Sequence, residues 1–366
     1  MNTPGAPAGR DAIRQRIGNL AQLGGARHVI LNEGAAKGMA AIDVDTGAGL
    51  RFTVLPDRGM DISLCSYKGT NLVYLTGNGE VNPAFYDAAG LGWLHTFFAG
   101  LLTTCGLTTL GAPGRDGDVE LGLHGRYSAL PARHVQDRSG WQGDRYAIEL
   151  QGVVEETRLF DHSLEMTRTL RTEIRSRALT LHDRVVNTGY SSSPCTILYH
   201  INAGHPLLSE HSELVLTAAR TEAHDDTSRA AMADFARFGA PVPGFQEQNF
   251  LHQMARGDDG LAHAAMLNPA LSGGLGLALA FDPAEVPYLN EWKMLGQRDY
   301  VVGIEPCTAP CANRARLREV GLLPMLEPGQ SRDITLHLQV LEGPDELAAY
   351  RQRHGMTPVF EPFTAL

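Results

Sequence analysis

The sequence lacks most of the signals that mark nucleic-acid, membrane or nucleotide binding. Its 31 Lys and Arg residues are outnumbered by 41 Asp and Glu residues, for a net charge of −10, and there is no polybasic run, so we expect no nucleic-acid partner. The most apolar stretch, residues 270–281, is too short and too rich in glycine to cross a membrane, so we expect no membrane partner. Neither a GxGxxG turn between a strand and a helix nor a P-loop motif occurs, which argues against a nucleotide fold.

Cysteine is scarce, and the N-terminus carries no apolar segment. The chain has 5 cysteines, an odd number, and MNTPGAPAGR contains no secretory signal, so we expect a reducing, cytoplasmic setting. Cys307 and Cys311 have no second Cys or His pair at metal-binding spacing, so structural zinc is not expected. The Pro-, Gly- and Ala-rich residues 1–9 predict a disordered tail, and the unbroken composition after them predicts one domain over 10–366.

Strand patterns dominate the rest of the chain. Residues 332–341 alternate apolar and polar side chains with period two, which is typical of a half-buried strand. The 40 glycines and 20 prolines separate further predicted strands at 146–154, 179–186, 212–218, 274–281 and 300–304. Short helices are predicted at 10–20, 227–238 and 344–353. We therefore predict an all-β fold, a large antiparallel sandwich with a few short helices, whose broad concave face holds the ligand.

Two early segments carry polar residues that strands alone do not require. In LPDRGMDI, Arg58 and Asp61 flank a glycine; they either hold a turn together or present Arg58 to substrate oxygens, with its orientation set by Asp61. In LHGRYSALPA, His124 and Arg126 are two residues apart, which on one strand face would allow both to contact a ligand. A structural histidine is the alternative.

Two later segments place polar residues at the ends of apolar strands. Alternation in residues 197–200 puts Leu198 and His200 on one face, and Asn202 follows at the edge of a candidate site. Glu305 follows the apolar run YVVGI, where burial would raise the pKa of its carboxyl into the range of a general base. Trp292 and Lys293 lie nearby in sequence, and an indole face can stack on a sugar ring or simply fill the core.

The order of these segments resembles the aldose 1-epimerase, or galactose mutarotase-like, superfamily, and especially its bacterial branch known as an epimerase-related domain of unknown function. The motifs that carry the resemblance cover roughly residues 20–345: LPDRGMDI, GLLTTCGL, LHGRYSALPA, the 179–208 segment, YVVGIEP and LLPMLEPGQSRDITLHLQVL. The resemblance implies a β-supersandwich. It also implies that His200 is the general acid, that Glu305 is the general base, and that His124 and either Arg58 or Arg126 contact the sugar. The family's sugar-binding aspartate has no evident counterpart, and residues 217–270 match nothing in it.

The implied reaction is exchange of sugar anomers without a cofactor. Glu305 would take the proton of the C1 hydroxyl while protonated His200, on the opposite side of the ring, protonates the ring oxygen. A metal-dependent sugar isomerase using His124, His200 and Glu305 is one alternative. A non-catalytic sugar-binding or sensing protein is another, and a glycosidase is a weaker one because Glu305 has no evident carboxylate partner. The substrate would be a small-molecule sugar of unspecified identity, and a homodimer stays open.

Overall fold

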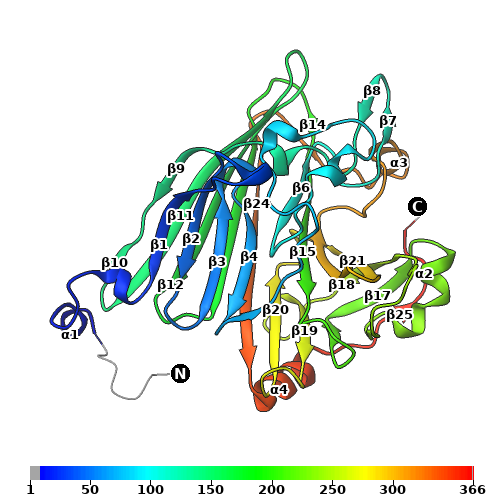
Figure 1. Ribbon diagram of the computed structural model, residues 1–366. Coiled ribbons are helices and arrows are strands. Elements are labelled where there is room, and N and C mark those ends of the chain that lie inside the picture. Colours follow the sequence, from blue (N-terminus) through cyan, green and yellow to red (C-terminus); the bar gives the residue numbers. More distant parts are fainter. Residues whose placement is uncertain (1–8, 365) are drawn as a thin grey trace.

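The computed structural model describes residues 9–364 and 366 and consists mainly of antiparallel strands. The first sheet has five strands in chain order, β1 (Gly25–Ile30), β2 (Ala40–Asp45), β3 (Leu50–Leu55), β4 (Asp61–Tyr67) and β5 (Thr70–Asn71). In Figure 1 these blue strands lie in front of the long strands of the second sheet. An isolated bridge from Ile62 to Leu102 connects this sheet to the third one.

The second sheet has nine strands and contains the clearest alternating segments. In β24 (Ser331–Glu342), the side chains of Ile334, Leu336 and Val340 are fully buried while the residues between them are more exposed, as the period-two pattern predicts. The strand order is β10 (Gly140–Gln142), β11 (Arg145–Thr157), β12 (Ser163–Glu173), β13 (Ala178–Asn187), β24, β20 (Leu275–Phe281), β19 (Ala262–Asn268) and β16 (Glu213–Leu216), with β9 (Arg133–Asp137) also paired to β11.

The third sheet has seven strands and carries the candidate site. Its order is β25 (Val359–Phe360), β17 (Ala218–Ala223), β18 (Gln248–Met254), β21 (Tyr288–Leu295), β22 (Tyr300–Cys307), β15 (Thr196–Gly204) and β6 (Thr103–Leu107). Only β25 runs parallel to its neighbour, β17, among the described strand pairs of this sheet. Two small two-stranded sheets complete the structure: β7 (Gly114–Asp116) with β8 (Val119–Leu121), and β14 (Ser193–Pro194) with β23 (Met325–Leu326).

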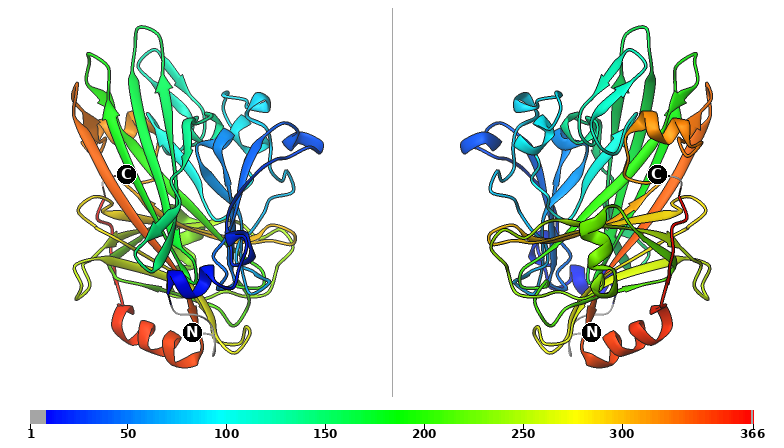
Figure 2. Two further views of the ribbon diagram at one scale, coloured as in Figure 1. Left: turned by 90° about the vertical axis from the view of Figure 1, so that its left-hand side faces the viewer. Right: turned by 90° about the vertical axis from the view of Figure 1, so that its right-hand side faces the viewer.

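Helices in the described part of the chain are short and lie outside the sheets. They are α1 (Arg10–Arg14), α2 (Asp226–Ala230), α3 (Arg314–Glu319) and α4 (Pro344–His354), and Figure 2 shows α4 below the sheets. The prediction at 344–353 is confirmed. The helix predicted at 10–20 is shorter, and the one at 227–238 divides into α2 and a single turn at Met232–Asp234. Helix α3 was not predicted from the sequence; its N-cap Asn313 accepts a hydrogen bond from the backbone N–H of Ala315.

The all-β prediction is confirmed, and one hydrophobic cluster joins the sheets. This cluster includes Ile42 of the first sheet, Leu181 of the second and Tyr199 of the third. The predicted tail falls largely on residues 1–8, outside the described residues, so the division into a tail and one domain stays a prediction. The side chains of Ile197 and Tyr199 face this cluster, while Leu198 packs in a second cluster on the other face of β15. The predicted alternation along β15 is therefore confirmed.

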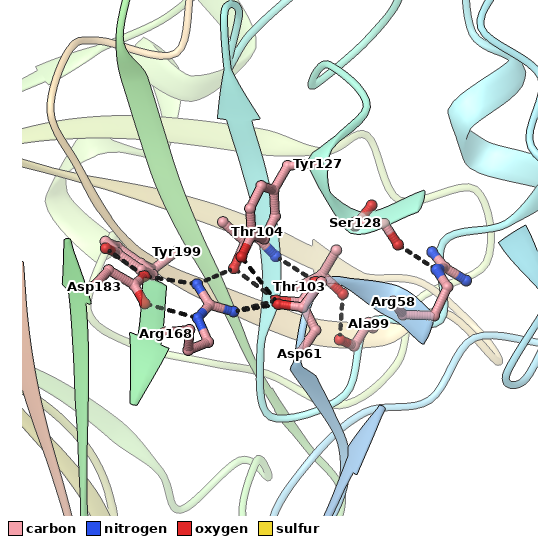
Figure 3. A network of polar contacts seen from close by, with 11 residues as sticks. Arg58, Asp61, Ala99, Thr103, Thr104, Tyr127, Ser128, Arg168, Asp183 and Tyr199 are labelled. Carbon is pink, nitrogen blue, oxygen red and sulfur yellow. Dashed lines mark hydrogen bonds and ion pairs between the residues drawn. The ribbon is translucent and has the colours of Figure 1, made fainter. Parts of the chain in front are cut away.

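A fully buried polar network ties the three sheets together behind β15 (Figure 3). Arg168 of β12 lies 2.8 Å from Asp61 of β4 and 2.7 Å from Asp183 of β13. The hydroxyl of Tyr199 donates to Asp183 at 3.0 Å, and the backbone and hydroxyl of Thr104 on β6 both donate to Asp61. Buried charges are tolerated when they are paired and hydrogen-bonded in this way. The network therefore fixes β15 and β6 beneath the candidate site.

Candidate active site

Two neighbouring strands bring His200 and Glu305 together. The register that pairs Leu198 with Cys307 and Ile201 with Ile304 sets His200 of β15 opposite Glu305 of β22. His200 Nε2 lies 3.1 Å from Glu305 Oε1, and their side chains are 5% and 1% exposed. Within the described residues, neither Glu305 Oε1 nor His200 Nδ1 has a hydrogen-bond partner. The pair is thus desolvated and keeps unused bonding capacity toward a ligand.

Burial sets the protonation of this pair. It raises the pKa of Glu305 to about 8, with Glu247 and Glu291 adding to the rise and the amide of Asn290, which donates to Glu305 Oε2 at 2.7 Å, opposing it. Burial and the nearby His124 lower the pKa of His200 well below its usual value. At neutral pH the pair therefore holds one proton, on the carboxyl. The mechanism implied by the family resemblance needs an ionised Glu305 and a protonated His200, the opposite arrangement.

Gly303 provides the space in which the two groups meet. A Cβ at this position would lie 2.1 Å from Glu305 Oε1 and 3.2 Å from His200 Cε1. No side chain fits there without displacing the carboxyl group. The glycine in the middle of an otherwise apolar central strand is therefore a requirement of the site.

His124 reaches the site from a turn. Its backbone φ is +58°, in the left-handed region, so the prediction that His124 and Arg126 share a strand face is wrong. Its Nδ1 lies 2.7 Å from the carbonyl of Leu110, which makes Nδ1 the donor and leaves Nε2 as an acceptor. Burial lowers the pKa of His124 to about 4, so the ring is neutral. Its centroid is 5.9 Å from that of His200.

These groups line a cavity of about 500 Å³, within the usual range of about 300–1,000 Å³ for small-molecule sites. Aromatic side chains form much of its wall. The ring centroids of Phe97 and Trp292 lie 5.0 and 5.5 Å from the ring centroid of His200. Trp93 stacks on Phe97 with 4.3 Å between the ring centroids. The predicted residues that line the cavity are His124, His200, Trp292 and Glu305.

Trp93, Phe97 and Glu247 also line the cavity but were not predicted as site residues from the sequence. The aromatic pair is carried on the 3₁₀ turn Gly92–His95 and the segment after it, where no periodic pattern marks a site. Glu247 lies in the 217–270 region, and its carboxylate accepts a hydrogen bond from Trp292 Nε1 at 2.9 Å. Glu247 lies between His200 and Glu305 in the chain, where the family's sugar-binding aspartate was sought. No local sequence signal distinguishes it from the other Asp and Glu residues of loops.

The structure does not bring Arg58 or Asp61 to the cavity, which corrects both predictions. Arg58 is fully buried, and its guanidinium group donates to the carbonyls of Ser128, Val81 and Thr96. Asp61 is also fully buried and is paired with Arg168. Both are held by internal partners, so neither has a free face for a substrate.

Arg126, Asn202 and Lys293 are not among the residues that line the cavity. Arg126 is exposed at the N-cap of the turn Tyr127–Ala129. Asn202 is buried and donates to the carbonyls of His200 and Gly100, so it braces the strand that carries His200. Lys293 lies on the opposite face of β21 from Trp292, with Nζ donating to the carbonyl of Asp234 at 2.8 Å. Adjacent residues of a strand face opposite sides, so Trp292 and Lys293 cannot both reach the site.

The described residues 9–364 and 366 contain no group of three or more His, Cys, Asp or Glu side chains arranged to hold a metal ion. None of their helices has the length and apolar character needed to span a membrane.

Known structures share this fold. A crystal structure of a "putative aldose 1-epimerase" from Klebsiella pneumoniae subsp. pneumoniae MGH 78578 has a TM-score of 0.87 and 25% identity, covering 93% of this chain and 91% of that chain. A galactose mutarotase-like protein from Clostridium acetobutylicum has a TM-score of 0.63 and 15% identity over 88% of this chain and 100% of that one. Galactose 1-epimerase from Lactobacillus acidophilus NCFM has a TM-score of 0.54 and 14% identity over 87% and 99%. No curated protein matches the sequence.

The fold therefore defines the chain as a galactose mutarotase-like all-β protein, as the sequence resemblance implied. Within that class it belongs to the family described as Domain of unknown function (DUF4432), which matches residues 36–340.

Proposed function

We propose that this protein is a carbohydrate-active isomerase of the aldose 1-epimerase type, which interconverts the anomers of a reducing sugar by opening and closing its ring. The observation that carries the proposal is the buried His200–Glu305 pair, 3.1 Å apart, at a cavity of about 500 Å³. The epimerase names of two similar structures support it. The free state of all five cysteines, four of them buried, supports a cytoplasmic setting.

The geometry suits proton transfer at two oxygens that share one carbon. In a cyclic aldose, C1 carries both the ring oxygen and the anomeric hydroxyl, so the two catalytic groups must lie close together. His200 and Glu305 are cross-strand neighbours 3.1 Å apart, so both can face the C1 end of one ring. The sequence had instead led us to expect the two groups on opposite sides of the ring. The protonated carboxyl of Glu305 donates to the ring oxygen, and neutral His200 accepts the proton of the C1 hydroxyl.

Ring opening moves one proton from Glu305 to the ring oxygen and one from the C1 hydroxyl to His200. The bond between C1 and the ring oxygen breaks, C1 becomes an aldehyde, and the pair is left as carboxylate and imidazolium. After rotation of the aldehyde, the ring oxygen attacks C1 and returns its proton to Glu305 while His200 reprotonates the new hydroxyl. The product is the other anomer, and the pair regains its starting state, so no cofactor is consumed.

The cavity walls suit a neutral sugar ring. The rings of Trp292 and Phe97 offer apolar faces for the C–H face of a pyranose. His124 Nε2 is an acceptor for a sugar hydroxyl because Nδ1 is committed to Leu110. These residues would orient the ring so that its C1 end meets the catalytic pair.

Proton NMR of anomeric exchange tests the proposal. A panel of neutral, deoxy and acidic aldoses is measured with the wild-type protein and with Glu305→Gln, which we expect to lose about 10²-fold or more of the exchange rate. Glu291→Gln is the matched control: Glu291 is a fully buried glutamate on the opposite face of adjacent β21, 3.3 Å from His252. Because it adds only a minor part of the rise in the pKa of Glu305, its loss should lower exchange far less than Glu305→Gln does.

The control also separates chemistry from folding, because both variants remove a buried carboxyl from the same sheet. Equal exchange by the wild type and Glu305→Gln would contradict the proposal. Saturation-transfer signals from bound sugars without any catalysed exchange would instead support the sugar-binding alternative.

A further inference from the structure

A single row of side chains continues from the catalytic pair across the seven-stranded sheet. The register pairs Glu305 with Asn290, Asn290 with Leu251, and Leu251 with Glu222. Neighbouring strands are about 4.8 Å apart, so the four steps from His200 to Glu222 span about 19 Å. The site face of the sheet is therefore much longer than the part occupied by the two catalytic groups.

A second cavity of about 500 Å³ lies above the far end of this row. Glu222 and Leu251 line it together with Phe360 and Thr364 of the C-terminal segment. Both cavities are lined by His224, Asn290 and Cys311, so they meet beside the residue that hydrogen-bonds Glu305. Each cavity alone is large enough for a small molecule.

The C-terminal segment is fixed as a wall of the second cavity. β25 pairs with β17, and the ring of Phe363 stacks on Tyr288 at 6.4 Å. The carboxylate of Glu222 accepts hydrogen bonds from the backbone of Phe363 at 2.8 Å and of Thr364 at 3.2 Å. The second cavity is therefore built into the fold by contacts between distant segments.

The charged groups of the second cavity are already paired. Glu222 is bound to the C-terminal segment, Glu361 lies 3.1 Å from Arg220, and Arg229 forms an ion pair with Asp226. The charged side chains that line the space are Glu222, Glu361 and Arg229, an excess of negative charge that disfavours a phosphate or carboxylate ligand. Polar groups beside Leu251 and Phe360 suit a neutral polyhydroxylated ligand instead.

We propose that the substrate is a reducing disaccharide, whose reducing ring lies at His200 and Glu305 and whose second, uncharged ring lies in the cavity above Leu251 and Glu222. This inference rests on the proposed function, since C1 of the first ring must be free to open. The second ring is attached through a hydroxyl other than that at C1.

The experiment compares kcat/KM for anomeric exchange between a monosaccharide and its own disaccharides. The best monosaccharide is measured beside its 6-phosphate and its reducing disaccharides. For glucose these are the β-linked sophorose, laminaribiose, cellobiose and gentiobiose and the α-linked kojibiose, nigerose, maltose and isomaltose. We expect at least one disaccharide to exceed the monosaccharide by roughly tenfold or more, the scale on which pocket contacts discriminate substrates.

A variant then assigns this preference to the second cavity. Leu251→Trp, which places a larger side chain on the cavity floor, should lower the ratio of disaccharide to monosaccharide kcat/KM toward one. Leu159→Trp, at a hairpin tip where the side chain is 78% exposed, is the matched control and should keep the wild-type ratio.

The wild-type comparison is decisive even if Leu251→Trp does not fold. A monosaccharide turned over as well as every disaccharide, or a 6-phosphate preferred to them all, overturns the inference. If the protein catalyses anomeric exchange of none of these sugars, the proposed function fails. Saturation-transfer measurements of binding to the same sugars then test the disaccharide site separately. Disaccharide binding that Leu251→Trp weakens would then support it, and no preference for disaccharides would overturn it.

Discussion

Replacing Glu305 by glutamine is expected to stabilise the protein at neutral pH while removing its activity. The folded protein keeps the Glu305 carboxyl protonated until about pH 8, whereas the same group in the unfolded chain ionises near 4.5. Between these pH values the Glu305 carboxyl binds fewer protons in the unfolded state than in the folded state. The contribution of this group to the free energy of unfolding therefore falls as the pH rises. Glutamine has the same shape and no proton to lose, and its amide oxygen can still accept the hydrogen bond from Asn290.

The magnitude follows from the two pKa values. Each pH unit between them costs the wild type about 1.4 kcal/mol of unfolding free energy. From pH 5 to pH 7 the wild type should therefore lose about 2.5 kcal/mol relative to Glu305→Gln. The loss begins near pH 4.5 and levels off above pH 8, where the folded carboxyl also ionises.

Urea unfolding of both proteins at several pH values measures this difference. Subtracting one curve from the other removes the contributions of titrating groups that the two proteins share. A stability difference that stays constant from pH 5 to pH 8 would mean that the Glu305 carboxyl ionises normally, and the protonation assigned to the catalytic pair would then be wrong.

Three other results are expected. Exchange activity should decline as the pH rises through about 8, because Glu305 loses the proton it donates; a pH profile of kcat/KM that rises there would contradict this role. Gly303→Ala should reduce exchange about 10²-fold without changing circular dichroism, since the new Cβ would displace the Glu305 carboxyl, while Gly140→Ala, in open space on an edge strand, should keep full activity. Arg168→Met should destabilise the protein by about 3–5 kcal/mol in urea unfolding, because it leaves two buried carboxylates unpaired; a loss below about 1 kcal/mol would refute the importance of that pairing.

The charged residues show where sequence reasoning stops. Arg58 and Asp61 are close in sequence and were expected to act together, but the partner of Asp61 is Arg168, on a different sheet. Lys293 follows Trp292 directly, yet the strand turns its side chain to the other face. A buried charge and a ligand-binding charge look alike in sequence, because the difference lies in which distant strand covers the side chain.

Local pattern by itself determined the main features of the fold. Period-two alternation predicted strands such as β24, the Pro344 signal predicted α4, and alternation along β15 put Leu198 and His200 on the face opposite Ile197 and Tyr199. These features depend on the dihedral angles of neighbouring residues, which the local sequence sets.

Only the tertiary structure decided the composition of the site. His200 and Glu305 are more than a hundred residues apart in the chain, and the pairing of β15 with β22 sets the 3.1 Å between them. The same pairing fixes the role of Gly303, and the packing of two turns and a loop against the sheet adds Trp93, His124 and Glu247. Desolvation, which sets the protonation of the pair, exists only after those long-range contacts exclude water.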